Sequence, residues 1–113
     1  MTRTIIATAN APKTPPQYSQ AVVAAGLVFV SGDPEQTAQR LRNISAILEA
    51  AGTSLKHAVQ ATFILVHEQD FAGLNEEWLK WFPDKPPARQ GAKLPVSPPG
   101  LRVSIAMIAA MPA

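Results

Sequence analysis

The sequence contains no cysteine, and this absence excludes a disulfide framework, a thiolate metal site and a cysteine nucleophile. Histidine is almost as scarce, and the two present, His57 and His67, cannot complete a metal shell alone. No apolar run approaches the roughly 20 residues needed to cross a bilayer, and the first residues lead into no signal-peptide core. We therefore expect a cytoplasmic protein that binds neither a metal nor a membrane.

Charged side chains are also few, at 16% of the 113 residues against 47% hydrophobic. That balance is apolar for so small a chain, which has much surface to cover, and it favours self-association. The formal net charge is only +2, and the basic residues are scattered from Arg3 to Arg102. Nucleic acid is therefore not the expected partner. The length predicts one domain spanning residues 1–113.

Local patterns predict six strands and two helices. Gly26 can supply the positive φ that a tight connection between the second and third strands needs. A first helix is predicted from an Asp33 N-cap to a stop at Gly52, and a second from an Asp70 N-cap to about Phe82. The predicted strands cover residues 4–8, 19–23, 27–31, 58–66, 89–94 and 101–110, the last two separated by a turn over 95–100.

The predicted order is thus β-β-β-α-β-α-β-β, without internal repeats. This order indicates an α+β sandwich with both helices on one face of a mixed sheet. The strand over residues 58–66 is apolar on both faces, with Val59, Ala61, Phe63 and Leu65 on one of them, and is expected to lie inside the sheet.

Several motifs in this arrangement resemble the reactive intermediate deaminase (Rid) family, also called YjgF or L-PSP. Each is weak alone, but together they cover nearly the whole chain in the right order and spacing. They are PQYSQAV at residues 16–22, VFVSG at 28–32, the segment 36–43 leading to ILEAAG at 47–52, DFAGLN at 70–75 with Trp78 and Phe82, PAR at 87–89, and residues 103–109.

The resemblance implies a chorismate-mutase-like fold and a homotrimer with pockets at the subunit interfaces. It further implies cofactor-free hydrolysis of reactive enamine and imine acids to 2-keto acids and ammonia. RNA cleavage is attributed to some relatives, but the low net charge, the single tyrosine and the lack of a base-stacking motif give it little support here.

Arg89 is the predicted anchor of the substrate carboxylate. It follows Pro86-Pro87-Ala88, which hold the backbone rigid while the guanidinium offers a two-pronged clamp. The alternative is an ion pair with Glu68, Asp70 or an acid of a neighbouring chain. Gly91 could offer its N–H to the same anion or simply mark a strand irregularity.

Four further residues are predicted to bind substrate, each with a structural alternative. Tyr18 could cover the ligand or be a half-buried interface tyrosine. Ser31 and Gly32 lie beside the substrate by resemblance, although a Ser-Gly pair also forms ordinary turns, and no histidine is placed to activate Ser31 as a nucleophile. Asn75 could hydrogen-bond the pocket from behind or be solvated on its helix.

Two departures from the family weaken the prediction of turnover. Ser104 is the second predicted catalytic residue, and it stands where deaminating members carry a glutamate that positions water; Ala106 is not acidic either. A hydroxyl can orient water but cannot accept its proton at neutral pH. In addition, the family's loop between Ser31-Gly32 and the first helix is shortened. A non-catalytic protein that binds a small carboxylate metabolite is therefore the alternative function.

Overall fold

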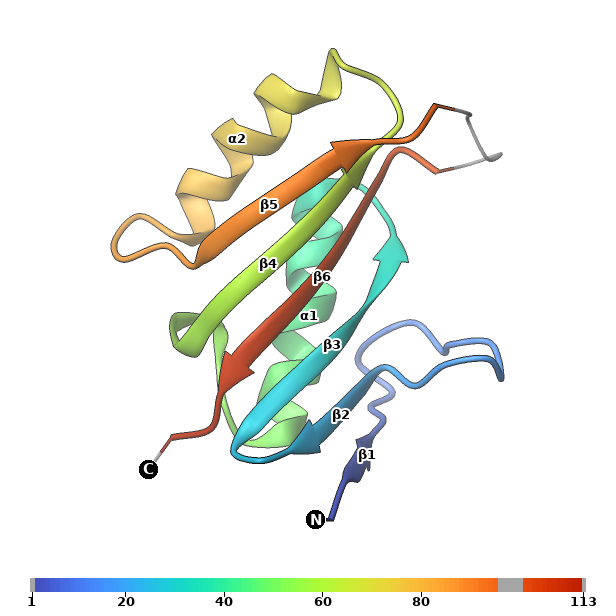
Figure 1. Ribbon diagram of the computed structural model, residues 1–113, viewed down its shortest axis with the longest axis vertical. Coiled ribbons are helices and arrows are strands. Elements are labelled where there is room, and N and C mark those ends of the chain that lie inside the picture. Colours follow the sequence, from blue (N-terminus) through green and yellow to red (C-terminus); the bar gives the residue numbers. More distant parts are fainter. Residues whose placement is uncertain (1, 96–100, 113) are drawn as a thin grey trace.

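The computed structural model describes residues 2–95 and 101–112, and it consists of one six-stranded mixed sheet with two α-helices on one face (Figure 1). The predicted turn over 95–100 lies outside the described residues beyond Pro95. The elements follow the predicted order: β1 Thr4–Ile6, β2 Ala21–Ala24, β3 Leu27–Pro34, α1 Thr37–Ala51, β4 Ala58–Leu65, α2 Asp70–Trp81, β5 Ala88–Lys93 and β6 Val103–Ala110, with a 3-10 turn at Leu55–His57.

The strands lie in the order β1-β2-β3-β6-β4-β5, and every neighbouring pair is antiparallel except β4 and β5. The parallel strands β4 and β5 are connected by α2. This helix therefore packs beside β5. The two central strands, β3 and β6, are covered by α1. As predicted, β4 lies inside the sheet.

The core lies between the sheet and the helices. Along β6 every second side chain is buried, including Val103, Ile105 and Met107, and these meet the buried stripe of α1 formed by Leu41, Ile44 and Leu48. The hairpin between β2 and β3 turns through Ala25 and Gly26, with φ of 54° and 77°. Two successive positive φ values match the twist of the strands in a two-residue hairpin, as expected at Gly26.

The predicted start of the first helix is wrong. Residues Asp33 and Pro34 continue β3, where they pair with Ile105 and Ser104 of β6, and α1 begins only at Thr37. The N–H of Glu35 also donates to the Val103 carbonyl, at 2.9 Å. Ladder bonds to β6 therefore prevail over the local capping pattern. The C-terminal stop is confirmed, because Gly52 has a φ of 94° and its N–H closes the last turn.

The second helix begins at Asp70, but Asp70 is not its N-cap. The N-cap is Gln69, which makes no side-chain cap bond, and the Asp70 carboxylate instead accepts two hydrogen bonds from the Arg102 guanidinium. These bonds hold the pKa of Asp70 below its usual value. Leu74 and Trp78 on this helix are buried, whereas Phe71 is 43% exposed.

The prediction for Val59 is also wrong in part. The register of β4 against β6 shifts between Ala58 and Gln60, and Val59 at this irregularity is 46% exposed. Ala61, Phe63 and Leu65 do face the core. Within the described ranges, no helix is long and apolar enough to span a membrane.

Candidate functional site

Arg89 lies near the start of β5, at the edge of the sheet, and its side chain is held from two sides. Its Nη2 donates to Asn75 Oδ1 of α2 at 2.8 Å. Its guanidinium carbon lies 5.0 Å from the ring centroid of Phe63 and 5.3 Å from that of Trp78. Both distances fall in the range of cation–π contact. The structure thus brings Asn75 to Arg89.

The proposed intrachain ion pairs of Arg89 are not formed. Glu68 lies 3.5 Å from Lys93, and Asp70 binds Arg102. Over residues 2–95 and 101–112, Arg89 has no ion pair of its own. Its side chain instead borders a shallow pocket of about 340 Å³, which is also lined by Asn75, Trp78, Leu79, Pro86 and Pro87. An exposed, braced guanidinium beside an apolar pocket suits a small carboxylate.

The structure gives a reason, based on packing, why residue 91 is a glycine, and neither interpretation of the sequence included it. Gly91 pairs with Phe63 across the parallel ladder, and a Cβ at this position would lie 2.3 Å from the Phe63 ring. The ring has little freedom to retreat, since it is buried and stacks on Phe71 with centroids 5.8 Å apart. Gly91 therefore lets the aromatic ring beside Arg89 lie flat against β5.

We expect Gly91→Ala to destabilise the fold by about 1–3 kcal/mol, because the added methyl group forces Phe63 out of its packing position. Urea unfolding would measure the loss. Gly73→Ala is the matched control: nothing lies within 4 Å of a Cβ there, and alanine favours the helix. Equal midpoints for Gly91→Ala and the wild type would contradict this account of Gly91.

The other predicted residues gather around the end of β3. Gly32 lies against β6, where a Cβ on it would be 3.0 Å from Ser104 Oγ. The Ser31 hydroxyl donates to the Ser19 carbonyl at 2.6 Å, and the Tyr18 hydroxyl donates to Asp33 Oδ1 at 3.3 Å. The Ser31 hydrogen bond ties the loop that carries Tyr18 to the end of β3.

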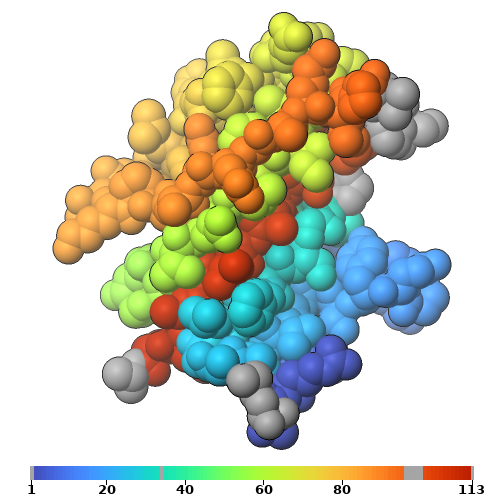
Figure 2. All heavy atoms as spheres, in the orientation of Figure 1, coloured from blue at the N-terminus to red at the C-terminus, as the bar shows by residue number. Residues whose placement is uncertain are grey.

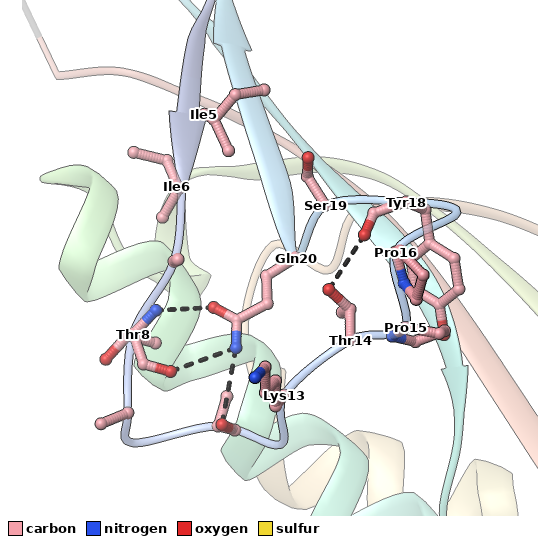
Figure 3. Close-up of a pocket in the computed structure, with 13 residues that line it drawn as sticks. Ile5, Ile6, Thr8, Lys13, Thr14, Pro15, Pro16, Tyr18, Ser19 and Gln20 are labelled. Carbon is pink, nitrogen blue, oxygen red and sulfur yellow. Dashed lines mark hydrogen bonds between the residues drawn. The ribbon is translucent and has the colours of Figure 1, made fainter.

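The loop that carries Tyr18 is pinned by the buried side chain of Gln20 (Figure 3). Its amide accepts from the Thr8 N–H at 2.7 Å and donates to the carbonyls of Thr8 at 3.1 Å and Pro12 at 3.0 Å. Thr14 Oγ1 donates to the Tyr18 carbonyl at 2.9 Å. These bonds fix the proline-rich loop beside β1. A cavity of about 690 Å³ is lined by residues of this strand and of the loop.

Arg40, which the sequence analysis missed, lies behind this end of β3. It is 2% exposed, and its Nε donates to the Ile105 carbonyl at 3.1 Å while its Nη2 donates to the Ser31 carbonyl. Between Val30 and Asp33 the β3–β6 ladder shifts register, so the guanidinium bonds two carbonyls at an irregular point of the sheet. Burial lowers the pKa of Arg40, and the charge of Asp33 opposes that shift.

Arg89 and Ser104 lie on opposite faces of the sheet. Arg89 pairs with Ala61, which pairs with the buried Met107, so all three point toward the helices. Ser104 alternates with the buried Ile105 and points to the other face. Within one chain, the structure therefore does not bring Arg89 and Ser104 to one substrate.

The face that carries Ser104 is not covered by either helix (Figures 1 and 2). The space-filling view shows atoms of β3, β6, β4 and β5 at its surface. Phe29 on this face is 41% exposed, and it borders a shallow hollow of about 220 Å³ that Thr62, Ala106 and Ile108 also line. An apolar sheet face of this kind is typical of a surface that another molecule covers.

Comparisons with known proteins place these features in a family. The chain is 38% identical over 120 residues to RutC family protein PH0854 of Pyrococcus horikoshii, and the alignment covers 93% of this chain and 95% of that protein. It is 36% identical over 124 residues to the 2-iminobutanoate/2-iminopropanoate deaminase of Capra hircus, covering 96% and 90%. The structure of E. coli TdcF with bound serine superposes with a TM-score of 0.87 at 28% identity, covering 96% and 99%.

The sequence profile described as Endoribonuclease L-PSP matches residues 8–111. The match spans every strand after β1 and both helices, and it includes all the residues that the sequence motifs had singled out. The chain therefore belongs to the endoribonuclease L-PSP family, which is the Rid family that its motifs resemble.

Proposed function

We propose that this protein hydrolyses reactive enamine and imine acids to 2-keto acids and ammonia, with Arg89 binding the substrate carboxylate. The observation that carries the proposal is the guanidinium itself: it is exposed, hydrogen-bonded to Asn75 and within cation–π distance of two aromatic rings, next to a pocket. Such bracing reduces the entropy that Arg89 would lose on binding a carboxylate. Relatives named 2-iminobutanoate/2-iminopropanoate deaminases support the reaction class.

The proposed active site lies between two copies of the chain, in a homotrimer. Because Arg89 and Ser104 point to opposite faces, one substrate can contact both only if a neighbouring copy supplies one of them. The exposed apolar face around Phe29 is the surface proposed to bring the copies together. Gly32, beside Ser104, would then face the Arg89 pocket of the neighbour, with Tyr18 at the end of the same strand through its hydrogen bond to Asp33.

The chemistry requires positioning more than strong acid–base groups. Imines are intrinsically labile toward water, so holding the carboxylate fixed and excluding bulk solvent accelerates hydrolysis without a cofactor. Ser104 can orient the attacking water through its hydroxyl. It cannot take the proton that water loses, and for this reason binding of a carboxylate metabolite without turnover is the second candidate function.

The test is 2-keto acid formation from freshly generated 2-iminobutanoate. We expect Arg89→Ala to lower kcat/KM by about 10²–10³-fold, because a bidentate charge-assisted contact and the orientation it gives are both lost. Gln90→Ala, at the next position of β5, is the matched control. Binding of 2-oxobutanoate to the wild type without any turnover would favour the second function, and equal rates for Arg89→Ala and wild type would remove Arg89 from the mechanism.

A further inference from the structure

The pocket beside Arg89 has a polar end and an apolar wall. Arg89 and Asn75, which are joined by a hydrogen bond of 2.8 Å, form the polar end. Four apolar residues form the rest of the lining: Trp78, Leu79, Pro86 and Pro87. The volume of about 340 Å³ lies in the range of sites that hold a whole small ligand. A ligand whose carboxylate binds at the polar end therefore has its side chain beside the apolar wall.

Two parts of this wall are rigid without a ligand. Trp78 is 4% exposed, and its ring packs against Phe82 with the centroids 4.8 Å apart. On the other side, Pro86 and Pro87 precede β5, and proline rings fix the backbone there. Pro87 is itself buried. The apolar wall is thus formed before a ligand binds, which reduces the entropy lost on binding.

Leu79 forms the outer part of the wall. It is 64% exposed, more than any other large hydrophobic side chain among the described residues. A single exposed leucine is common on protein surfaces, but this one follows Trp78 directly and lines the same pocket. Its neighbour Lys80 does not line the pocket and pairs with Glu77 at 3.4 Å. A ligand side chain that lies on Leu79 would remove apolar surface from water.

We propose that this pocket selects imino acids with bulky apolar side chains, and that Leu79 is its specificity-determining residue. The inference rests on the proposed function and names the substrate class of the same site. With the substrate carboxylate on Arg89, the substrate side chain lies against Trp78 and Leu79. Arg89 is the one charged residue of the lining, so a second charge on the substrate would have no partner there.

The test compares two substrates that differ only in the side chain. 2-Imino-4-methylpentanoate carries an isobutyl group, whereas 2-iminobutanoate carries an ethyl group. We expect the kcat/KM of the wild type to be about tenfold higher for the larger substrate, because its additional carbons leave water for the apolar wall. Formation of the corresponding 2-keto acids measures both rates.

The variant Leu79→Ala removes the outer part of the wall. We expect the preference for the larger substrate to fall from about tenfold to about twofold, while kcat/KM for 2-iminobutanoate stays within about twofold of wild type. The substitution keeps a good helix former at an exposed position, so the fold is retained. Lys80→Ala is the matched control on the same helix and should keep the full preference.

Failure of this inference and failure of the proposed function give different results. If the wild type hydrolyses both substrates without preferring the larger one, or if Leu79→Ala keeps the full preference, the inference is wrong and the proposed function stands.

If the wild type hydrolyses neither substrate, the proposed function fails, and binding of the 2-keto acids then tests the pocket by calorimetry. The wild type should bind 4-methyl-2-oxopentanoate about tenfold more tightly than 2-oxobutanoate, and Leu79→Ala should reduce this difference to about twofold. Equal affinities of the wild type for the two keto acids, or no binding of either, would overturn the role of Leu79 as well.

Discussion

An equimolar mixture of Arg89→Ala and Gly32→Val chains, unfolded and refolded together, should recover about a quarter of the wild-type activity, although each variant alone is inactive. Each proposed site takes Arg89 from one copy and Gly32 from its neighbour. In a randomly mixed assembly, half of the Arg89 positions and half of the Gly32 positions are intact, so about one site in four has both. Keto acid formation from 2-iminobutanoate measures the recovery.

The choice of Gly32→Val follows from its surroundings. Gly32 does not have a positive φ, so valine meets no backbone strain, but its side chain would occupy the space next to Ser104 Oγ. The variants mixed without unfolding serve as the control for subunit exchange. If the two variants co-assemble and the activity still stays at background, Arg89 and Gly32 do not belong to one site. The proposal of an active site shared between two copies would then be wrong.

The sequence predicted the order of elements because each depends on local periodicity. It failed at both helix starts for one physical reason. Asp33 and Asp70 each precede a helical pattern and suit a cap, but distant partners on or next to β6 hold them: Ile105 through the ladder, and Arg102 through its guanidinium. Local capping contributes about 1 kcal/mol, which strand pairing or a charged pair can exceed.

The surroundings of the Arg89 side chain were predictable only in part. The sequence left Asn75 open between a hydrogen bond to the pocket and a solvated position, and the structure places its Oδ1 2.8 Å from Arg89 Nη2. Phe63 was recognised only as an apolar strand residue and Trp78 only as part of a helical motif. That their rings flank the guanidinium depends on the parallel pairing of β4 with β5, which decides the face on which Arg89 emerges. No local pattern in the sequence encodes that register.

Arg40 shows the limit of periodicity most clearly. It sits next to Leu41 on a helix whose apolar stripe is easily recognised, and a charged residue there suggests a solvated position. Its burial depends on the two carbonyls that the β3–β6 register shift leaves beside it. A buried guanidinium without a carboxylate partner is costly, so it persists only where several hydrogen bonds compensate.

We therefore expect Arg40→Ala to destabilise the fold by about 3–5 kcal/mol, because it removes the hydrogen bonds to the Ile105 and Ser31 carbonyls and opens a cavity beneath α1. Arg42→Ala is the matched control on the same helix: Arg42 is exposed, and among the described residues its side chain bonds Gln39 alone, so its loss should stay within about 0.5 kcal/mol. Urea unfolding at one fixed protein concentration measures both, since assembly would shift the midpoints.

Arg40→Met separates the two contributions, because it refills most of the volume but restores neither hydrogen bond. We expect it to lie between Arg40→Ala and the wild type in stability. Suppose that Arg40→Met were as stable as the wild type. The free energy gained by no longer burying a charge would then equal the free energy lost with both hydrogen bonds to the carbonyls, and Arg40 would not stabilise this end of β3. The conformation of β3 around Ser31 and Gly32 would then have to be set by the pairing of Asp33 with Ile105 and by the loop that Gln20 holds in place.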